Sequence, residues 1–98
     1  MYGTIARMRV KPGKGEELKQ YACAVDPPAG SLAVLLYKSD TDPDEYWVAV
    51  VFEGEEAFRA NADSDRQNER YRQMRELLVA DPEWHDGEVV HSFMRPES

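Results

Sequence analysis

The sequence is poor in several features that mark particular classes of protein. It has a single cysteine, Cys23, so no disulfide can form within the chain. Its 12 basic residues stand against 19 acidic ones, which gives a net charge of −7. This balance disfavours nucleic acid and anionic membrane surfaces as partners, because both attract basic proteins. The longest apolar runs, at residues 32–37 and 46–52, are far shorter than the roughly 20 residues that span a bilayer.

These absences favour one small domain. No repeat, low-complexity stretch or long linker divides the chain, so we expect a single domain over residues 1–98. The opening residues 1–4 lack the basic and apolar regions of a signal peptide. With one cysteine and no export signal, we expect a cytoplasmic location.

Hydrophobic periodicity predicts an alternation of strands and helices. We expect, in order, a strand at 2–10, a helix at 16–25, strands at 31–38 and 45–53, a short helix from 54, a helix from a Ser64 cap to Pro82, and a strand at 88–94. This order predicts an α+β fold, a ferredoxin-like sandwich with a four-stranded antiparallel sheet and helices on one face.

The strands predicted at 31–38 and 45–53 are apolar on both faces. A strand with one face in water would alternate apolar and polar residues, so both faces must be covered. Helices can cover one face. In so short a chain, a second copy of the protein is the expected cover for the other.

Some polar and aromatic residues are candidates for chemistry. His85 and His91, with Asp86 and Glu88, could supply a metal site, but their spacing matches no ligand motif and a polar turn is the favoured interpretation. Cys23 is expected to be a partly buried structural thiol. The many aromatic residues either fill the core or line an apolar cavity, and composition leaves both alternatives open.

Residues 51–64, with the sequence VFEGEEAFRANADS, resemble the signature of the antibiotic biosynthesis monooxygenase domain, and residues 6–13 resemble its first strand and turn. The resemblance implies a dimeric α+β barrel, a homodimer in which two sheets pack face to face. It also implies a pocket between each sheet and its own helices. Some members of that family oxygenate quinol-like aromatic compounds without a cofactor, and others degrade haem.

The resemblance can be followed to individual positions. Where haem-degrading members use an asparagine, a tryptophan and a histidine, this chain has Ala6, Asn61 and Tyr71, so haem degradation is not expected. Where polyketide-oxidising members place polar residues, tryptophan or tyrosine, it has Val48, Phe52 and Phe58. The resemblance therefore implies an apolar pocket.

The expected function is monooxygenation of a small aromatic or quinol compound, without a cofactor or metal. Asn61 and Tyr71 would orient the substrate and stabilise its anion, and His91 would be the base if its strand faces inward. The expected substrate-binding residues are Ala6, Val48, Phe52, Phe58, Arg70 and Met74. The alternative is a dimer of the same fold that binds a small apolar ligand, or serves as an accessory protein, without catalysis. A metal-dependent isomerase or lyase is a third, remote class.

Overall fold

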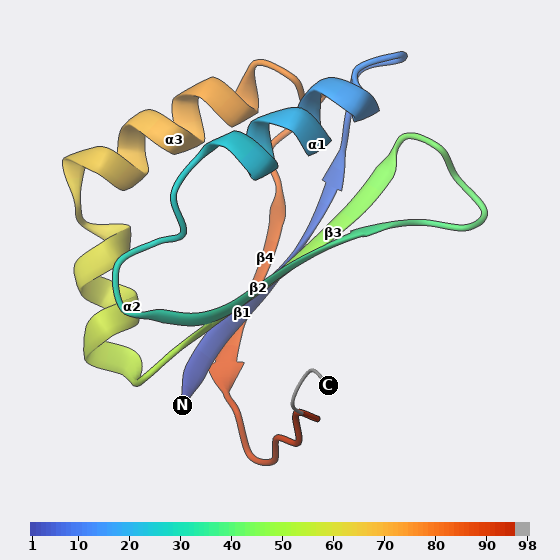
Figure 1. Cartoon of the computed structure of the whole chain (residues 1–98). Coiled ribbons are helices and arrows are strands. Elements are labelled where there is room, and N and C mark those ends of the chain that lie inside the picture. Colours follow the sequence, from blue (N-terminus) through green and yellow to red (C-terminus); the bar gives the residue numbers. More distant parts are fainter. Residues whose placement is uncertain (96–98) are drawn as a thin grey trace.

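The fold is a four-stranded antiparallel sheet with three helices on one face, as the sequence predicts. The computed structural model describes residues 1–95. Its elements are β1 (Tyr2–Arg9), α1 (Gly15–Ala24), β2 (Ser31–Lys38), β3 (Glu45–Phe52), α2 (Glu55–Ala62), α3 (Asp65–Arg75) and β4 (Glu83–Glu88). Figure 1 shows all three helices on the same side of the sheet. No helix within the described residues is long and apolar enough to cross a membrane.

Strand β1 lies inside the sheet, because the strand order is β2-β3-β1-β4. Thr4 of β1 pairs with Val50 of β3 on one side and with Asp86 of β4 on the other. Val34 of β2 pairs in turn with Val50. Because paired residues share a face of the sheet, these four form one row across its helix-facing side. The row changes from apolar to polar toward the β4 edge.

Helix α3 begins at the predicted cap. The Oγ of Ser64 accepts a hydrogen bond from the backbone N–H of Gln67 at 3.1 Å. The helix ends at Arg75, earlier than the predicted stop near Pro82. The backbone carbonyl of Leu77 accepts a hydrogen bond from the N–H of Lys11 at 2.8 Å, and Leu78 forms an isolated bridge with Val10. The chain therefore leaves the helix early to pair with the end of β1.

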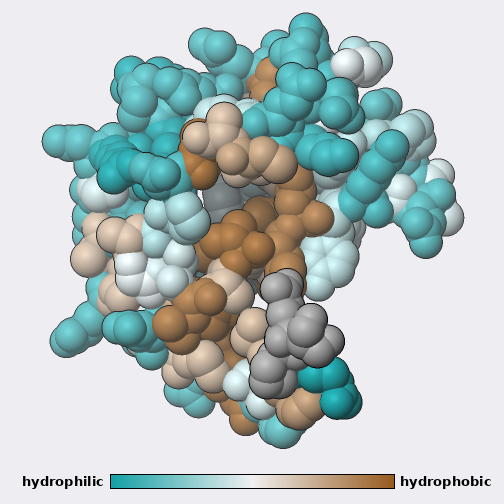
Figure 2. Space-filling view, viewed as in Figure 1, coloured by the Kyte–Doolittle hydropathy of each residue, from teal (hydrophilic) through white to brown (hydrophobic). Residues whose placement is uncertain are grey.

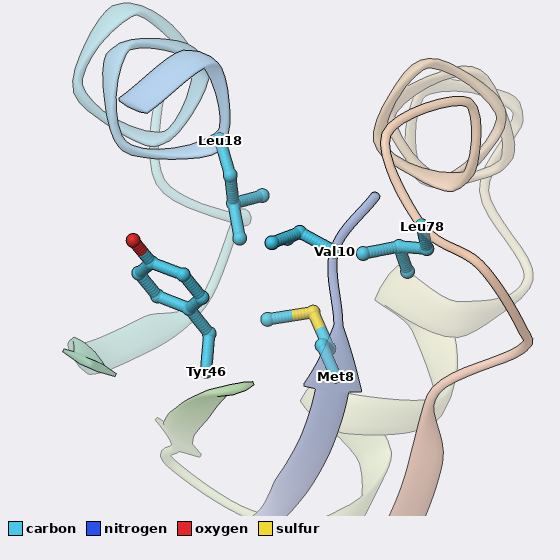
Figure 3. Close-up of a cluster of buried hydrophobic side chains, with 5 residues drawn as sticks. All are labelled: Met8, Val10, Leu18, Tyr46 and Leu78. Carbon is cyan, nitrogen blue, oxygen red and sulfur yellow. The ribbon is translucent and has the colours of Figure 1, made fainter. Parts of the chain in front are cut away.

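A small hydrophobic cluster joins the helices to the sheet. Its buried members are Met8, Val10, Leu18, Tyr46 and Leu78. In Figure 3, Leu18 reaches from α1 and Leu78 from the segment after α3, and both point toward Met8 of β1 and Val10 just after it. Leu18 is the one buried residue of α1, so its packing fixes this helix against the sheet.

The face of the sheet opposite the helices, which we call the open face, has an apolar part on β1, β2 and β3 that no helix of residues 1–95 covers, and Arg7 forms ion pairs with Glu45 and Glu83 on the same face. Ile5, Leu35 and Tyr37 are 51%, 55% and 54% exposed there. Their register partners Ala49 and Trp47 share this face. Strands β2 and β3 are therefore largely apolar on both sides, as predicted, and the helices cover only one of the two sides.

The last strand lies earlier than predicted, at Glu83–Glu88 instead of residues 88–94. The bridge between Val10 and Leu78 brings the chain to the far end of β1. From there it runs antiparallel to β1 until Glu88 pairs with Tyr2, at the first residue of β1. Residues 89–95 form no strand, although several of them are apolar. The pairing with the first strand ends at the hydrogen bond that the N–H of Val89 donates to the carbonyl of Met1 at 2.9 Å.

Candidate active site between the sheet and the helices

A cavity of about 1180 Å³ lies between the sheet and the three helices. All four strands contribute to its floor, and α1, α2, α3 and residues 25–28 form its walls. Figure 2 shows apolar side chains gathered around this hollow, which opens to the surface. Pockets that bind small organic molecules have volumes of about 300–1,000 Å³. The cavity is therefore large enough for a small aromatic ligand.

Most of the predicted site residues line this cavity. They are Val48, Phe52, Phe58, Asn61, Arg70, Tyr71 and Met74. Ala6 does not line it; its side chain is fully buried on the same strand face, between those of Thr4 and Met8. His91 is exposed in the segment after β4 and is also absent from the lining. The predicted strand at 88–94, which would have turned His91 inward, is wrong because β4 ends at Glu88. His91 therefore does not face the cavity as the expected base.

Three polar side chains form a network where α2 meets α3. The amide of Asn61 donates to Gln67 Oε1 at 3.3 Å, and the guanidinium of Arg70 donates to the same oxygen at 3.1 Å. All three side chains line the cavity. Gln67 was not singled out from the sequence, although its place on the inward face of the predicted helix was a usable signal. It holds both predicted polar groups in fixed positions.

Tyr21 of α1 is a phenol that lines the cavity. Its hydroxyl donates to the backbone carbonyl of Arg70 at 2.9 Å, which links α1 to α3 across the cavity. Burial raises the pKa of Tyr21, the positive charge of Arg70 opposes that rise, and the negative charge of Glu69 adds to it. Tyr21 therefore remains a neutral hydrogen-bond donor at physiological pH.

Tyr71 borders the cavity with its ring, but its hydroxyl has a partner elsewhere. The hydroxyl donates to Asp81 at 3.4 Å, and the guanidinium of Arg75 donates to the same carboxylate oxygen at 2.8 Å. Burial and then the charge of Asp81 raise the pKa of Tyr71. Asp81 is exposed and does not line the cavity. The hydroxyl can therefore donate a hydrogen bond to a ligand only if its long, weak hydrogen bond to Asp81 is broken.

A threonine and an aspartate form a second polar feature, on the floor. Thr4 is buried, and its Oγ1 donates to Asp86 Oδ1 at 2.7 Å. Both residues line the cavity. From the sequence, Asp86 was considered only as part of a turn and as a possible metal ligand. Its role in the floor follows from the shifted position of β4, which the sequence pattern did not reveal.

The cysteine and the candidate metal ligands from the sequence do not form a nucleophilic or metal site in the described residues. Cys23 is exposed at the border of the cavity, not partly buried as predicted, because it lies five positions after the inward-facing Leu18 on a helix with 3.6 residues per turn. Asp86 and His85 alternate along β4 and so face opposite sides of the sheet. Within residues 1–95, no three histidine, cysteine or acidic side chains lie close enough together to hold a metal ion.

The arrangement of strands and helices around this cavity matches a known family. The family model described as antibiotic biosynthesis monooxygenase matches residues 1–77. The chain belongs to the antibiotic biosynthesis monooxygenase (ABM) family. The resemblance noted in the sequence is thus confirmed. The ABM match spans β1 through α3, and β4 lies beyond it.

Solved structures share the fold of this ABM chain along nearly its whole length. A candidate antibiotic biosynthesis monooxygenase from Chloroflexus aurantiacus is 24% identical with a TM-score of 0.80, covering 95% of this chain and 96% of that one. Another from Bordetella bronchiseptica is 21% identical with a TM-score of 0.79, covering 92% and 97%. A third from Deinococcus radiodurans is 14% identical with a TM-score of 0.78, covering 99% and 100%. No protein of curated function matches the sequence.

Proposed function

We propose that this ABM protein is a cofactor-independent monooxygenase that acts on a small aromatic, quinol-type compound in the cavity between sheet and helices. The observation that carries the proposal is the cavity itself. Its floor is largely apolar, with Met8, Val48 and Phe52 among the lining side chains. Two hydrogen-bonded groups of polar side chains lie in its lining, one at the α2–α3 corner and one at the β4 edge. Such a site holds an aromatic ring out of water while a few polar groups orient it.

Cofactor-independent oxygenation requires an apolar cavity and a few well-placed polar groups. Loss of a proton from a hydroxyl makes the ring electron-rich enough to pass an electron to dioxygen. One oxygen atom then enters the substrate as a carbonyl group, and the other leaves as water with two substrate hydrogens, so no external reductant is required. The protein has to exclude water, stabilise the anion by hydrogen bonds and accept a proton. Asn61 and Tyr71 are the proposed donors to the anion.

The proposed active form is a homodimer that assembles through the open face. Ile5, Leu35 and Tyr37 expose a contiguous apolar surface there, which a second copy would bury. Leu35→Asp should convert the dimer to monomer in sedimentation at micromolar concentration. Gln20→Asp, at an exposed position of α1 on the other side of the sheet, should leave the mass unchanged. A wild-type protein that sediments at the mass of one chain would refute the proposed dimer.

A second candidate, ligand binding without turnover, is favoured by one specific observation. The amide of Asn61 and the hydroxyl of Tyr71 already have partners in Gln67 and Asp81. The histidine expected to act as base lies outside the cavity. A protein that only binds a ligand needs the apolar floor and a fixed polar network. An oxygenase must also release Asn61 and Tyr71 from their present partners and have a base within reach of the substrate.

Oxygen uptake with a panel of anthrones and quinols separates the two candidates. The assay uses purified protein with a chelator and no added cofactor. Uptake above the uncatalysed rate that falls in Asn61→Ala and Tyr71→Phe, but not in the matched surface variant Gln73→Ala, supports the oxygenase. Absence of uptake, together with thermal stabilisation by the same compounds, supports the binder. Neither uptake nor stabilisation would refute both.

A further inference from the structure

The sheet floor of the cavity carries a carboxylate whose direction is fixed by a buried hydroxyl. Thr4 and Asp86 are register partners on β1 and β4, so their side chains stand next to each other on the helix-facing side. Thr4 is 7% exposed, and its Oγ1 lies 2.7 Å from Asp86 Oδ1. An ionised carboxylate only accepts hydrogen bonds, so Thr4 is the donor. Of the described strand residues that line the cavity, Asp86 alone is acidic.

The second oxygen of this carboxylate is available to a ligand. Thr4 engages Oδ1, and within residues 1–95 no side chain donates a hydrogen bond to Oδ2. The nearby guanidinium of Arg59 donates instead to Glu55, at 2.9 Å. A carboxylate has room for several hydrogen bonds at its two oxygens. Asp86 therefore presents an unused acceptor at the edge of an otherwise apolar floor.

The residues beside Asp86 favour an aromatic occupant. Trp84 lies two residues earlier on the same face of β4 and also lines the cavity. Beyond Thr4 the same row continues to Val50 and Val34, both in the lining. A flat ring lying over this apolar part of the floor would bring a substituent on its edge within reach of the carboxylate.

We propose that Asp86, positioned by Thr4, accepts a hydrogen bond from an aromatic hydroxyl group of the ligand and thereby selects hydroxylated rings over their ethers and over carboxylates. This inference rests on the proposed function in so far as it needs a ligand in the cavity. An ether has no proton to donate to the carboxylate, and an anionic ligand would meet a like charge. Asp86 lies on β4, outside residues 1–77 that match the family model.

Three naphthalene probes of nearly equal size test the selectivity: 1-naphthol, 1-methoxynaphthalene and 1-naphthoate. Calorimetric titration of the full chain should show 1-naphthol binding about tenfold or more tightly than the ether, as expected for a hydrogen bond to a charged group. Naphthoate should bind most weakly. In Asp86→Ala the preference for naphthol over the ether should fall to about onefold, and naphthoate should gain affinity. Glu83→Ala, on the same strand but on the opposite face, should retain the wild-type ratios.

Substitutions at Thr4 test the positioning role. Thr4→Val keeps the shape but removes the donor, and it should reduce the naphthol preference several-fold. Thr4→Ser restores the hydroxyl and should restore the preference, which a loss of packing alone would not do. Circular dichroism of each variant confirms that it is folded.

The outcomes distinguish this inference from the proposed function. Equal wild-type affinity for naphthol and its ether would overturn the role of Asp86 and leave the cavity as a ligand site. A preference that survives in Asp86→Ala would overturn that role as well. Binding of none of the probes would overturn both. A hydroxyl preference that depends on Asp86, in a protein without oxygen uptake, would uphold the inference and refute the oxygenase.

Discussion

Leu18→Ala should be among the most damaging single substitutions in this protein. Leu18 is 2% exposed, and it is the one buried residue of α1. Truncating a buried leucine to alanine costs about 2–5 kcal/mol in free energy of unfolding, and more when the space cannot collapse. Because Leu18 also borders the cavity, the neighbouring chain can relax into the space, so we expect about 3 kcal/mol. For a domain of this size that corresponds to a fall in Tm of roughly 12–24 °C.

Urea unfolding followed by circular dichroism, with a thermal melt, measures this loss. Gln20→Ala, at an exposed position on the same helix, is the matched control and should change the free energy of unfolding by less than about 0.5 kcal/mol. A Leu18→Ala protein whose Tm falls by less than about 4 °C would show that α1 is held by contacts other than this side chain. Leu18 would then not be the residue that fixes this wall of the cavity.

Three further predictions concern a helix cap and two titrating groups. Ser64→Ala should lower the free energy of unfolding by about 1 kcal/mol in urea titrations, because it removes the α3 cap, whereas Ser64→Asp should retain it. The hydrogen bond from Arg9 holds the pKa of Asp42 below its ordinary value. The ionised Asp42 therefore stabilises the fold fully above about pH 4, and this stabilisation is lost as the pH falls through the pKa of Asp42 in the folded state. Asp42→Asn should weaken this acid dependence, and an unchanged pH profile would contradict the prediction. Burial raises the pKa of Tyr21, so stability should decline above about pH 10, where the unfolded chain loses the proton first. Tyr21→Phe should reduce that decline.

The sequence was sufficient to predict most of the fold because its first three strands and three helices carry strong local signals. The alternation in residues 2–10 and the Ser64 cap both reappear in the structure. The last strand was misplaced for a non-local reason. Residues 88–94 look more like a strand than residues 83–88, but only the latter arrive opposite β1 after the bridge between Val10 and Leu78. The register between β1 and β4 therefore depends on residues that are far apart in the chain.

The misplaced last strand also explains which residues of the site could be predicted from the sequence and which could not. Side chains on correctly predicted elements, such as Phe58 and Met74, do line the cavity. His91 and Asp86 were interpreted wrongly because both belong to the misplaced strand and its neighbourhood. The pair Asp86-Gly87 is typical of a turn, yet here it lies inside a strand, where Thr4 pairs with Asp86. Hydrogen bonding between residues 82 positions apart could not be inferred from local spacing.

The interior position of β1 has a consequence for the way the protein is made. The ribosome produces β1 before the other described elements, yet one of its two edges is paired by β4, the last of them to emerge. Until Glu83–Glu88 emerge, the nascent sheet presents an unpaired edge, which is a template for association with other chains. Polypeptides terminated within α3 should therefore aggregate, even though they contain every strand but one.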